Sequence, residues 1–442
     1  MSAVTDPAAT SDPVVGAMGR TADPAALRVV LLLNNAFTSD SRSWKLATSL
    51  TAAGCDVTVV ARPADGQPPV AVRDGYRIVR VAPPQTLRWL QAPGLPPART
   101  GDPARTGRSA TVRTRVRDTL GRAAQAARYL VRARTWAAAI DDAIGGGAVD
   151  VWQSEGLVTL PVALRLRTKR GGKVIYDSRD IHLESARFAL LPDRWRDLLA
   201  GRERRWAQSA DAVVTVNVPY AEHLERTLGR PMTLVFNGPL PYDPPDPPDR
   251  RCHLALGLPE SSQVALILGA VVAHRGIDEA AIAIGELPEV HLVVIGDGGA
   301  KPAIEARAAA LPHAGRIHFL PSRPPDEIPG WTASADVAVI PIQPSTLNHR
   351  LVTPTRLFDA MGAGVPVVAS DLPGMASIVR ETAIGVLVDP TTPESIATGI
   401  REILDAPADR RAAYRDACLA AARGPYAWER GVERLLALYR SA

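Results

Sequence analysis

Cysteine is scarce in this chain of 442 residues, and long apolar runs are absent. The three cysteines, Cys55, Cys252 and Cys418, form neither a Cys-x-x-Cys nor a Cys/His metal pattern, so we expect reduced thiols. No apolar run approaches the roughly 18 residues of a membrane-spanning helix. Residues 1–26 lack the hydrophobic centre of a signal peptide. These absences predict a cytoplasmic protein that begins with a disordered tail over residues 1–26.

Lysine is rare as well, since only four of the 51 basic residues are lysines and the rest are arginines. The planar guanidinium of arginine can bind two phosphate oxygens at once, so this bias is compatible with a phosphorylated ligand. A GC-rich genome would produce the same bias. With 46% hydrophobic and 22% charged residues, the composition is that of a globular protein, and we expect no nucleic-acid partner.

Two binding motifs are missing from the loops that follow the expected strands. The chain continues after the first strand through residues 34–42 without a glycine, which argues against the Gly-x-Gly-x-x-Gly turn of an NAD- or FAD-binding domain. No Asp-x-Asp motif stands in a suitable loop. We therefore expect neither a cofactor nor a metal ion.

Short β-branched runs alternate with helix-like segments along the whole chain. This alternation predicts an α/β fold with parallel sheets, and the length of the chain favours more than one domain. The expected strands cover residues 27–33, 57–60, 76–81, 149–152, 173–176, 212–216 and 233–236 in the first half, and 264–268, 291–295, 316–320, 337–340, 366–369 and 385–388 in the second. A proline-rich linker at 239–250 separates a first domain that ends at 238 from a second domain at 251–424.

Polar residues follow several strands of the first half. Asp40 is expected to cap a helix that begins at Ser41, and Arg42 follows it. Because ligands bind at the carboxyl ends of parallel strands, these strand-end residues are candidates for one wall of a substrate cleft. Helix caps and ion pairs without a role in binding would give the same pattern. The candidates are Asp40, Arg42, Glu155, Asp177 and Arg179.

The second half carries candidates for a diphosphate site. Gly269 ends a strand and permits close approach of the backbone, and Arg275 and Gly276 stand just before an expected helix. Pro354 is suited to begin another helix, on which Arg356 and Asp359 share a face. Arginine can reach phosphate and aspartate can accept from a ribose diol, although an intrahelical ion pair would look the same.

Residues 112–140 can be written as a basic amphipathic helix with arginines opposite an apolar stripe. Such a helix can lie on an anionic membrane surface, which would make the protein peripheral at the inner face of the membrane. The alternative is an ordinary domain helix whose arginines are solvated.

Several short motifs occur in a fixed order along the second half. They are Arg275-Gly-Ile277, Gly296-Asp-Gly298, Ala335-Asp-Val337, the run Pro354-Thr-Arg-Leu-Phe-Asp-Ala-Met361, Ala363–Ser370 and Gly385–Pro390. The ordered set resembles retaining GT-B glycosyltransferases of family 4. The resemblance implies two facing Rossmann-like domains with a cleft between them, the C-terminal one binding a nucleotide sugar. It also implies that the last helix crosses back, so that 27–238 and 425–442 form one domain.

The chain departs from the family pattern at several positions. The two glutamates that the family places eight positions apart correspond to Leu351 and Asp359, and the first cation of its phosphate-binding pair falls at Ala270. Gln153 and Arg179 stand where the family often has histidines. Donor binding is thus better supported than the details of catalysis.

The resemblance implies transfer of a hexose from a UDP- or GDP-sugar, with retention and without a metal, to a carbohydrate, glycolipid or small-molecule acceptor. Arg275 and Arg356 would stabilise the leaving diphosphate and Asp359 would bind the ribose. Further donor contacts are expected from Gly269, Gly276, Ser345, Thr346, Leu347, Asn348, Pro354 and Thr355. Two alternatives are a nucleotide-sugar epimerase of similar fold and a catalytically silent binding protein at the membrane surface.

Overall fold

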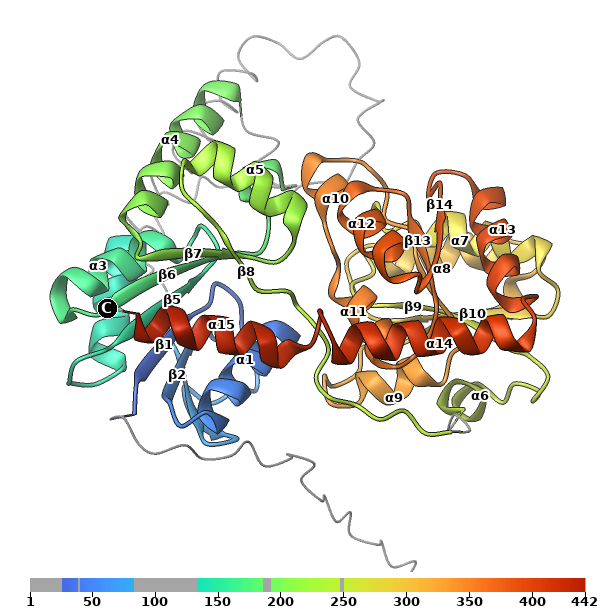
Figure 1. The fold of residues 1–442 in the computed structure, drawn as a ribbon, viewed down its shortest axis with the longest axis horizontal. Helices are drawn as coiled ribbons and strands as arrows, with labels where there is room; N and C mark the ends of the chain where they lie inside the picture. The colour runs from blue at the N-terminus through green and yellow to red at the C-terminus, as the bar shows by residue number, and fades with distance from the viewer. Residues whose placement is uncertain (1–25, 39, 83–132, 186–191, 247–249, 442) are drawn as a thin grey trace, which may run out of the picture.

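The computed structural model describes residues 26–38, 40–82, 133–185, 192–246 and 250–441. They form two α/β lobes that lie side by side, each built on its own parallel sheet (Figure 1). We call them the N-terminal lobe, which holds the first sheet, and the C-terminal lobe, which holds the second. The fold class expected from the sequence is confirmed.

The sheet of the N-terminal lobe has the strand order β3-β4-β2-β1-β5-β6-β7-β8 in the described residues. Its pairs are parallel except for the antiparallel pair of β3 and β4 at one edge. The strands are β1 (Arg28–Leu32), β2 (Asp56–Ala61), β3 (Val70–Arg73), β4 (Tyr76–Arg80), β5 (Val151–Glu155), β6 (Lys173–Ser178), β7 (Ala212–Thr215) and β8 (Thr233–Leu234).

Helices cover both faces of this sheet. One face packs against α3 (Leu160–Arg170), α4 (Asp193–Ser209), α5 (Val218–Leu228) and the helical residues 133–143. The other packs against α1 (Ser41–Ala52) and the last helix, α15 (Trp428–Arg440). A short 3-10 turn, η3 (His182–Glu184), follows β6. Because both faces are covered, the central strands are apolar on both sides, as parallel strands usually are.

The sheet of the C-terminal lobe has the order β11-β10-β9-β12-β13-β14, and its pairs are parallel. Its strands are β9 (Gln263–Leu268), β10 (Val290–Ile295), β11 (Ile317–Leu320), β12 (Val337–Ile340), β13 (Val367–Ser370) and β14 (Gly385–Val388). Alternate residues of β9 face opposite helical layers: Ala265 and Ile267 contribute to one apolar cluster and Val264 and Leu266 to another.

One helical layer of this lobe contains α7 (Ile277–Ala283), η4 (Ile284–Glu286), α8 (Lys301–Ala309) and α13 (Pro393–Leu404), and η5 (Ala314–Arg316) precedes β11. The opposite side carries α6 (Arg251–Leu256), α9 (Ile328–Ala333), α11 (Thr355–Gly362), α12 (Pro373–Thr382) and α14 (Ala408–Arg423). The short α10 (Leu347–Leu351) packs toward the N-terminal lobe.

The chain crosses between the lobes twice, and the two crossings touch. The first follows β8 through Asn237 and Gly238, and the second joins α14 to α15 through Tyr426, so that α14 lies along one lobe and α15 along the other (Figure 1). A Cβ atom at Gly238 would lie 1.8 Å from the carbonyl oxygen of Tyr426, so only glycine fits there. Trp428 then enters the core of the N-terminal lobe.

Each of the thirteen strands expected from the sequence overlaps an observed strand, but β3 was not expected. This edge strand is short and its Val70 and Val72 are exposed, so it lacks the buried apolar run that marks the others. The expected tail at 1–26 lies outside the described residues except for its last residue, and so does the Arg-rich segment up to residue 132. The described residues 133–140 are helical, with Trp136 and Ile140 in the core. Among the described helices, none has the length and apolar character needed to cross a bilayer.

Candidate functional site between the lobes

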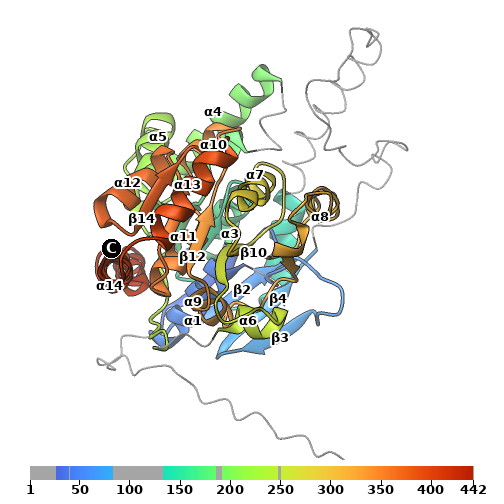
Figure 2. The ribbon, with the colours of Figure 1, turned by 90° about the vertical axis from the view of Figure 1, so that its right-hand side faces the viewer.

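A cavity of about 530 Å³ lies between the carboxyl ends of the two sheets. The N-terminal lobe contributes the start of α1 and the residues after β6, and the C-terminal lobe contributes the residues after β9, β10 and β11 and the start of α11. Figure 2 views the molecule from the side of the C-terminal lobe, with α11 and β12 in front of the N-terminal sheet. This is where open parallel sheets bind ligands.

Two glycines shape the wall formed by the C-terminal lobe. Gly269 has a φ of 113°, and a Cβ atom there would lie 2.9 Å from the Nη2 atom of Arg356. Gly276 has a φ of 68° and precedes α7, and a Cβ atom there would lie 2.0 Å from the carbonyl oxygen of Pro341. Both positions therefore need glycine. Gly269 lines the cavity, whereas Gly276 lies behind it and fixes the start of α7 next to Arg275.

Arg275 and Arg356 line the same wall, as the sequence predicts. In the described part of the chain neither guanidinium has an ion-pair partner. Burial, followed by repulsion from Arg275, lowers the pKa of Arg356 to about 9, although Asp359 opposes the shift. Burial also lowers the pKa of Arg275, against the attraction of Asp180 and Tyr220. Two unpaired cations that repel each other form a site that an anion would stabilise.

The first turn of α11 adds backbone donors beside these cations. Pro354 is its N-cap residue and Thr355 begins the helix, so the first N–H groups have no helical acceptors and can bind an anion. The side chain of Asn237 donates from Nδ2 to Oγ1 of Thr355 at 2.6 Å. Pro354 and Thr355 both line the cavity, and their donor contacts stay a prediction.

Asp359 lies one turn further along α11 and also lines the cavity. Burial raises its pKa to about 6, against the attraction of Lys45 and Arg356. Lys45 belongs to α1 of the other lobe, and burial lowers its pKa to about 7, against the attraction of Asp359. The cavity is therefore lined by a carboxyl group from one lobe and an amino group from the other, and the two attract each other.

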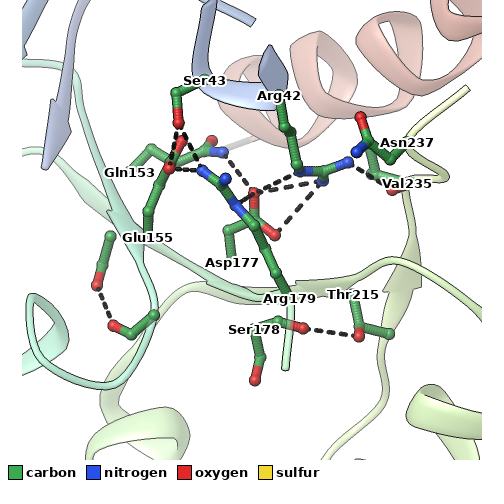
Figure 3. A network of polar contacts seen from close by, with 12 residues as sticks. Arg42, Ser43, Gln153, Glu155, Asp177, Ser178, Arg179, Thr215, Val235 and Asn237 are labelled. Atoms are coloured by element: carbon green, nitrogen blue, oxygen red, sulfur yellow. Dashed lines mark hydrogen bonds and ion pairs between the residues drawn. The ribbon is translucent and has the colours of Figure 1, made fainter. Parts of the chain in front are cut away.

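The N-terminal wall is a dense polar network (Figure 3). Arg42 donates to Asp177 at 3.3 Å and to the carbonyl oxygen of Val235 at 3.1 Å. Arg179 forms an ion pair with Asp40 at 3.1 Å and another with Glu155. Asp40, Arg42 and Arg179 line the cavity, whereas Glu155 and Asp177 stand behind them and hold the two arginines in place.

Asp40 both pairs with Arg179 and caps α1. Its carboxylate accepts a hydrogen bond from the backbone N–H of Ser43 and so caps α1, as predicted. Burial alone would raise the pKa of Asp40, but the attraction of Arg179 and hydrogen bonds from Ser43 and Asn35 outweigh it and lower the pKa to about 2. Asp40 is therefore a carboxylate at any physiological pH.

The residues Ser345, Thr346, Leu347 and Asn348 do not line the cavity. Thr346 caps α10, Leu347 packs against the core of the N-terminal lobe, and Ser345 lies 2.7 Å from the Nδ1 atom of His349. Asn348 accepts from the backbone N–H of Ile181 and the hydroxyl of Tyr220. The segment thus makes an interlobe contact in this structure, and the diphosphate contact expected from the sequence stays a prediction. The sequence pattern could not distinguish an interlobe contact from a diphosphate contact, because a polar loop after a strand can make either.

Some polar residues of the cavity were not singled out from the sequence, among them Arg323, Lys45 and Asn237. Arg323 follows β11, so the strand-end rule could have found it as a ligand-facing residue. Lys45 and Asn237 carried no such signal, because one lies inside a helix and the other begins a linker. The guanidinium of Arg323 lies 4.4 Å from the ring centroid of Trp331.

The charges around the cavity favour an anionic ligand. Its described lining carries six basic and four acidic side chains, namely Arg42, Lys45, Arg179, Arg275, Arg323 and Arg356 against Asp40, Asp180, Asp297 and Asp359. On the N-terminal wall Arg42 and Arg179 form ion pairs, in part with Asp177 and Glu155 behind the lining. On the C-terminal wall Arg275, Arg323 and Arg356 have no ion-pair partner among the described residues, so the unpaired guanidiniums lie on that wall. No group of three or more His, Cys, Asp or Glu side chains in the described residues could hold a metal ion.

Two facing parallel-sheet lobes joined by two crossings, with a cationic cavity between them, define the GT-B class of glycosyltransferase folds. Solved structures of this class are similar over nearly the whole chain. Sucrose-phosphate synthase from Thermosynechococcus elongatus has a TM-score of 0.69 and 16% identity, covering 94% of this chain and 98% of the other. Anabaena HepE in complex with UDP has a TM-score of 0.62 and 15% identity, covering 93% and 98%. At these identities the likeness shows the fold.

Within this class, residues 252–418 match the family described as glycosyl transferases group 1. The resemblance to GT-B glycosyltransferases is confirmed for the fold and for the group 1 domain that residues 252–418 match in the C-terminal lobe. A D-inositol 3-phosphate glycosyltransferase of Thermobispora bispora is 30% identical over 208 residues, which are 44% of this chain and 47% of that protein. The corresponding protein of Xylanimonas cellulosilytica is 30% identical over 254 residues, 54% of this chain and 59% of that protein. The chain thus spans about half the length of the curated relatives it matches.

Proposed function

We propose that the protein transfers a hexose from a UDP- or GDP-sugar to an acceptor hydroxyl, with retention at the anomeric carbon and without a metal ion. One observation carries this proposal. Two unpaired guanidiniums, those of Arg275 and Arg356, meet the free N–H groups of α11 on one wall of the interlobe cavity. A diphosphate that leaves the sugar develops negative charge, and fixed donors of this kind stabilise it without rearrangement.

The chemistry needs few further groups. The bond between the anomeric carbon and the donor phosphate oxygen breaks, and the acceptor oxygen bonds to that carbon on the same face. The acceptor proton passes to an oxygen of the leaving diphosphate, so no histidine base is required. Asp359 accepts from the ribose hydroxyls, and the acceptor lies against Asp40 and Arg179 on the opposite wall. The similar structure of HepE is a complex with UDP-glucose, which supports a nucleotide-sugar donor.

The rest of the cavity suits a nucleobase. Arg323 packs its guanidinium over Trp331 and still lines the cavity, so it offers a planar cationic face beyond the diphosphate position. Guanidinium planes stack well on aromatic rings. This face accommodates uracil or guanine, and comparing turnover of a UDP-sugar with that of a GDP-sugar distinguishes the two bases.

The test is donor turnover, measured as UDP or GDP released from UDP-glucose and GDP-mannose with and without added sugars, glycolipids and polyols. Transfer predicts release that depends on the acceptor, and NMR of the product gives the anomeric configuration. Loss of activity after treatment with a chelator would contradict metal independence. Interconversion of the nucleotide sugar without acceptor would favour the epimerase.

One observation favours a second candidate, the catalytically silent binding protein. Leu351 stands where the family has its first glutamate, and it packs against the apolar core of the N-terminal lobe. A carboxylate at that position is therefore missing from the cavity. Tight nucleotide binding without release in any combination of donor and acceptor would select this candidate over the transferase.

A further inference from the structure

Lys45 is buried in an unusual place for a lysine. It lies on the first helix of the N-terminal lobe, its residue is 3% exposed, and it still borders the interlobe cavity. Its Nζ atom donates to the carbonyl oxygens of Asn237 at 3.3 Å and Gly238 at 2.6 Å. The same atom lies 4.7 Å from the ring centroid of Trp428. Burial of an ammonium is costly, so this geometry needs a reason.

Its contacts join both crossings between the lobes. Asn237 and Gly238 belong to the first crossing, and Trp428 begins α15 just after the second. Asn237 continues the connection, because its Nδ2 atom donates to Oγ1 of Thr355 in the first turn of α11. Lys45 is therefore linked through one residue to the helix whose N-terminus faces the expected diphosphate.

Asp359 stands four residues after Thr355 on the same helix and lines the same cavity as Lys45. The charged groups that act on Lys45 are Asp359 and Asp40 as attractions and Arg42 and Arg179 as repulsions. Those that act on Asp359 are Lys45 and Arg356, both attractions. Each residue thus has the other as its largest electrostatic attraction, and removal of either leaves the other's buried charge less well compensated.

We propose that Lys45 is a positioning residue of the nucleotide site. Through Asn237 it holds the first turn of α11 against the two crossings, so that Asp359 on this helix is placed to accept from the ribose hydroxyls. The inference rests on the proposed function, since it concerns the same nucleotide. It assigns to the N-terminal lobe a part in binding the donor, although Lys45 need not touch the nucleotide itself.

The pH dependence of binding separates this role from simple packing. Burial already raises the pKa of Asp359, and Lys45 is the larger of the two attractions that limit the rise. Without Lys45 the pKa of Asp359 rises further, so nucleotide binding requires a higher pH. If Lys45 only filled space, its replacement by a side chain of similar length would leave the pH midpoint of nucleotide binding unchanged.

The experiment is calorimetric titration of the full chain with UDP-glucose and GDP-glucose over a range of pH. The variants are Lys45→Met, Asp359→Asn, the double variant, and Lys173→Met as the matched control. Lys173 also donates to a backbone carbonyl of α15, that of Tyr439 at 2.9 Å, but it does not line the cavity. We expect Lys45→Met to weaken nucleotide binding about tenfold near neutral pH, which corresponds to about 1.4 kcal/mol. We also expect it to move the pH midpoint of nucleotide binding to a higher pH. Lys173→Met should bind like the wild type.

The double variant supplies a check on folding and on coupling. If Lys45 acts through Asp359, adding Lys45→Met to Asp359→Asn weakens binding little further, and the double variant melts higher than Lys45→Met alone, because both charges are removed together. Additive losses of binding, or an unchanged pH midpoint in Lys45→Met, would overturn the inference. If the wild type binds neither nucleotide, the proposed function fails instead, whereas the melting temperatures still report whether the two residues are coupled.

Discussion

The guanidinium of Arg356 lies over Gly269, so close that a Cβ atom at that glycine would stand 2.9 Å from its Nη2 atom. Two elements distant in sequence thus meet where one of them lacks a side chain, and a Cβ atom there would require the guanidinium to move. Gly269 follows β9 and Arg356 belongs to the first turn of α11. The position of the cation in the cavity therefore depends on the backbone of the neighbouring strand end.

Gly269→Ala should consequently displace Arg356 and reduce donor turnover by roughly tenfold or more, about 1.4 kcal/mol in the barrier. The φ of 113° is also strained for alanine, so we expect a lower melting temperature. Gly299→Ala is the matched control, because a Cβ atom there meets nothing within 4 Å. Both variants are compared by melting temperature and by UDP or GDP release, and full activity of Gly269→Ala would show that Arg356 does not need its present position.

Arg275→Ala and Arg356→Ala should lose most turnover while folding normally. Removing a fixed donor to a developing negative charge commonly costs on the order of a hundredfold in rate. Neither arginine has an ion-pair partner among the described residues, and the two repel each other, so their loss should not lower the melting temperature. Arg380→Ala serves as the control, since it removes an exposed ion pair with Asp371 that lies outside the cavity. Retention of more than about a third of wild-type turnover would exclude a leaving-group role for that arginine.

The sequence predicted the sheets and the cationic wall more fully than the contacts between lobes. Strands such as β9 and β12 are continuous apolar runs, and Arg275 and Arg356 stand near helix starts, so local patterns were enough. The link from Lys45 through Asn237 to Thr355 depends instead on how two lobes and two crossings meet. No local spacing encodes such a contact. For the same reason the sequence predicts a donor contact for Asn348 but not the hydrogen bond that its side chain accepts from Tyr220 of the other lobe.

Asp359 should give nucleotide binding and protein stability opposite dependences on pH. Its carboxylate is the form that accepts from ribose hydroxyls, so affinity should fall as the pH drops through about 6, the raised pKa of this group. Because that value exceeds the 3.8 of an unperturbed aspartate, the folded state takes up the proton more readily than the unfolded state. The resulting stabilisation is present at low pH and is lost as the pH rises through about 6.

The measurement is calorimetric titration with UDP-glucose, whose diphosphate is esterified at both ends and keeps a constant charge in this range. Asp359→Asn provides the reference, because it cannot ionise. We expect the difference in affinity between wild type and Asp359→Asn to shrink on the acid side of about pH 6. An equal difference at all pH values would mean that the charge of Asp359 plays no part in binding.

The Arg-rich segment 112–140 should bind anionic vesicles if the acceptor is a lipid. Attraction between its arginines and anionic headgroups should weaken with salt, because the screening length is roughly 10 Å at 0.1 M. The variant Arg113→Gln, Arg117→Gln, Arg122→Gln and Arg128→Gln removes four of these charges, and vesicle sedimentation compares it with the wild type. Equal binding of the two proteins at low salt would reject a membrane role for this segment.

The ion pair of Arg42 and Asp177 should matter more for stability than for the donor. Both side chains are almost completely buried and their nearest atoms are 3.3 Å apart, and Gln153 donates to the same carboxylate. Burial raises the pKa of Asp177, whereas the attraction of Arg42 opposes the rise. Asp177→Asn would leave Arg42 buried without its counter-ion, which typically costs about 3–5 kcal/mol. We expect a large drop in the denaturant midpoint of Asp177→Asn, measured by urea unfolding.

The exposed pair of Arg423 and Asp243 is the control, and Asp243→Asn should change stability by less than about 1 kcal/mol. The double variant Arg42→Met with Asp177→Asn should recover part of the loss, because it no longer buries an uncompensated cation. If Asp177→Asn unfolded at the wild-type midpoint, the network would not hold the N-terminal wall together, and Arg42 would instead be free to bind the acceptor.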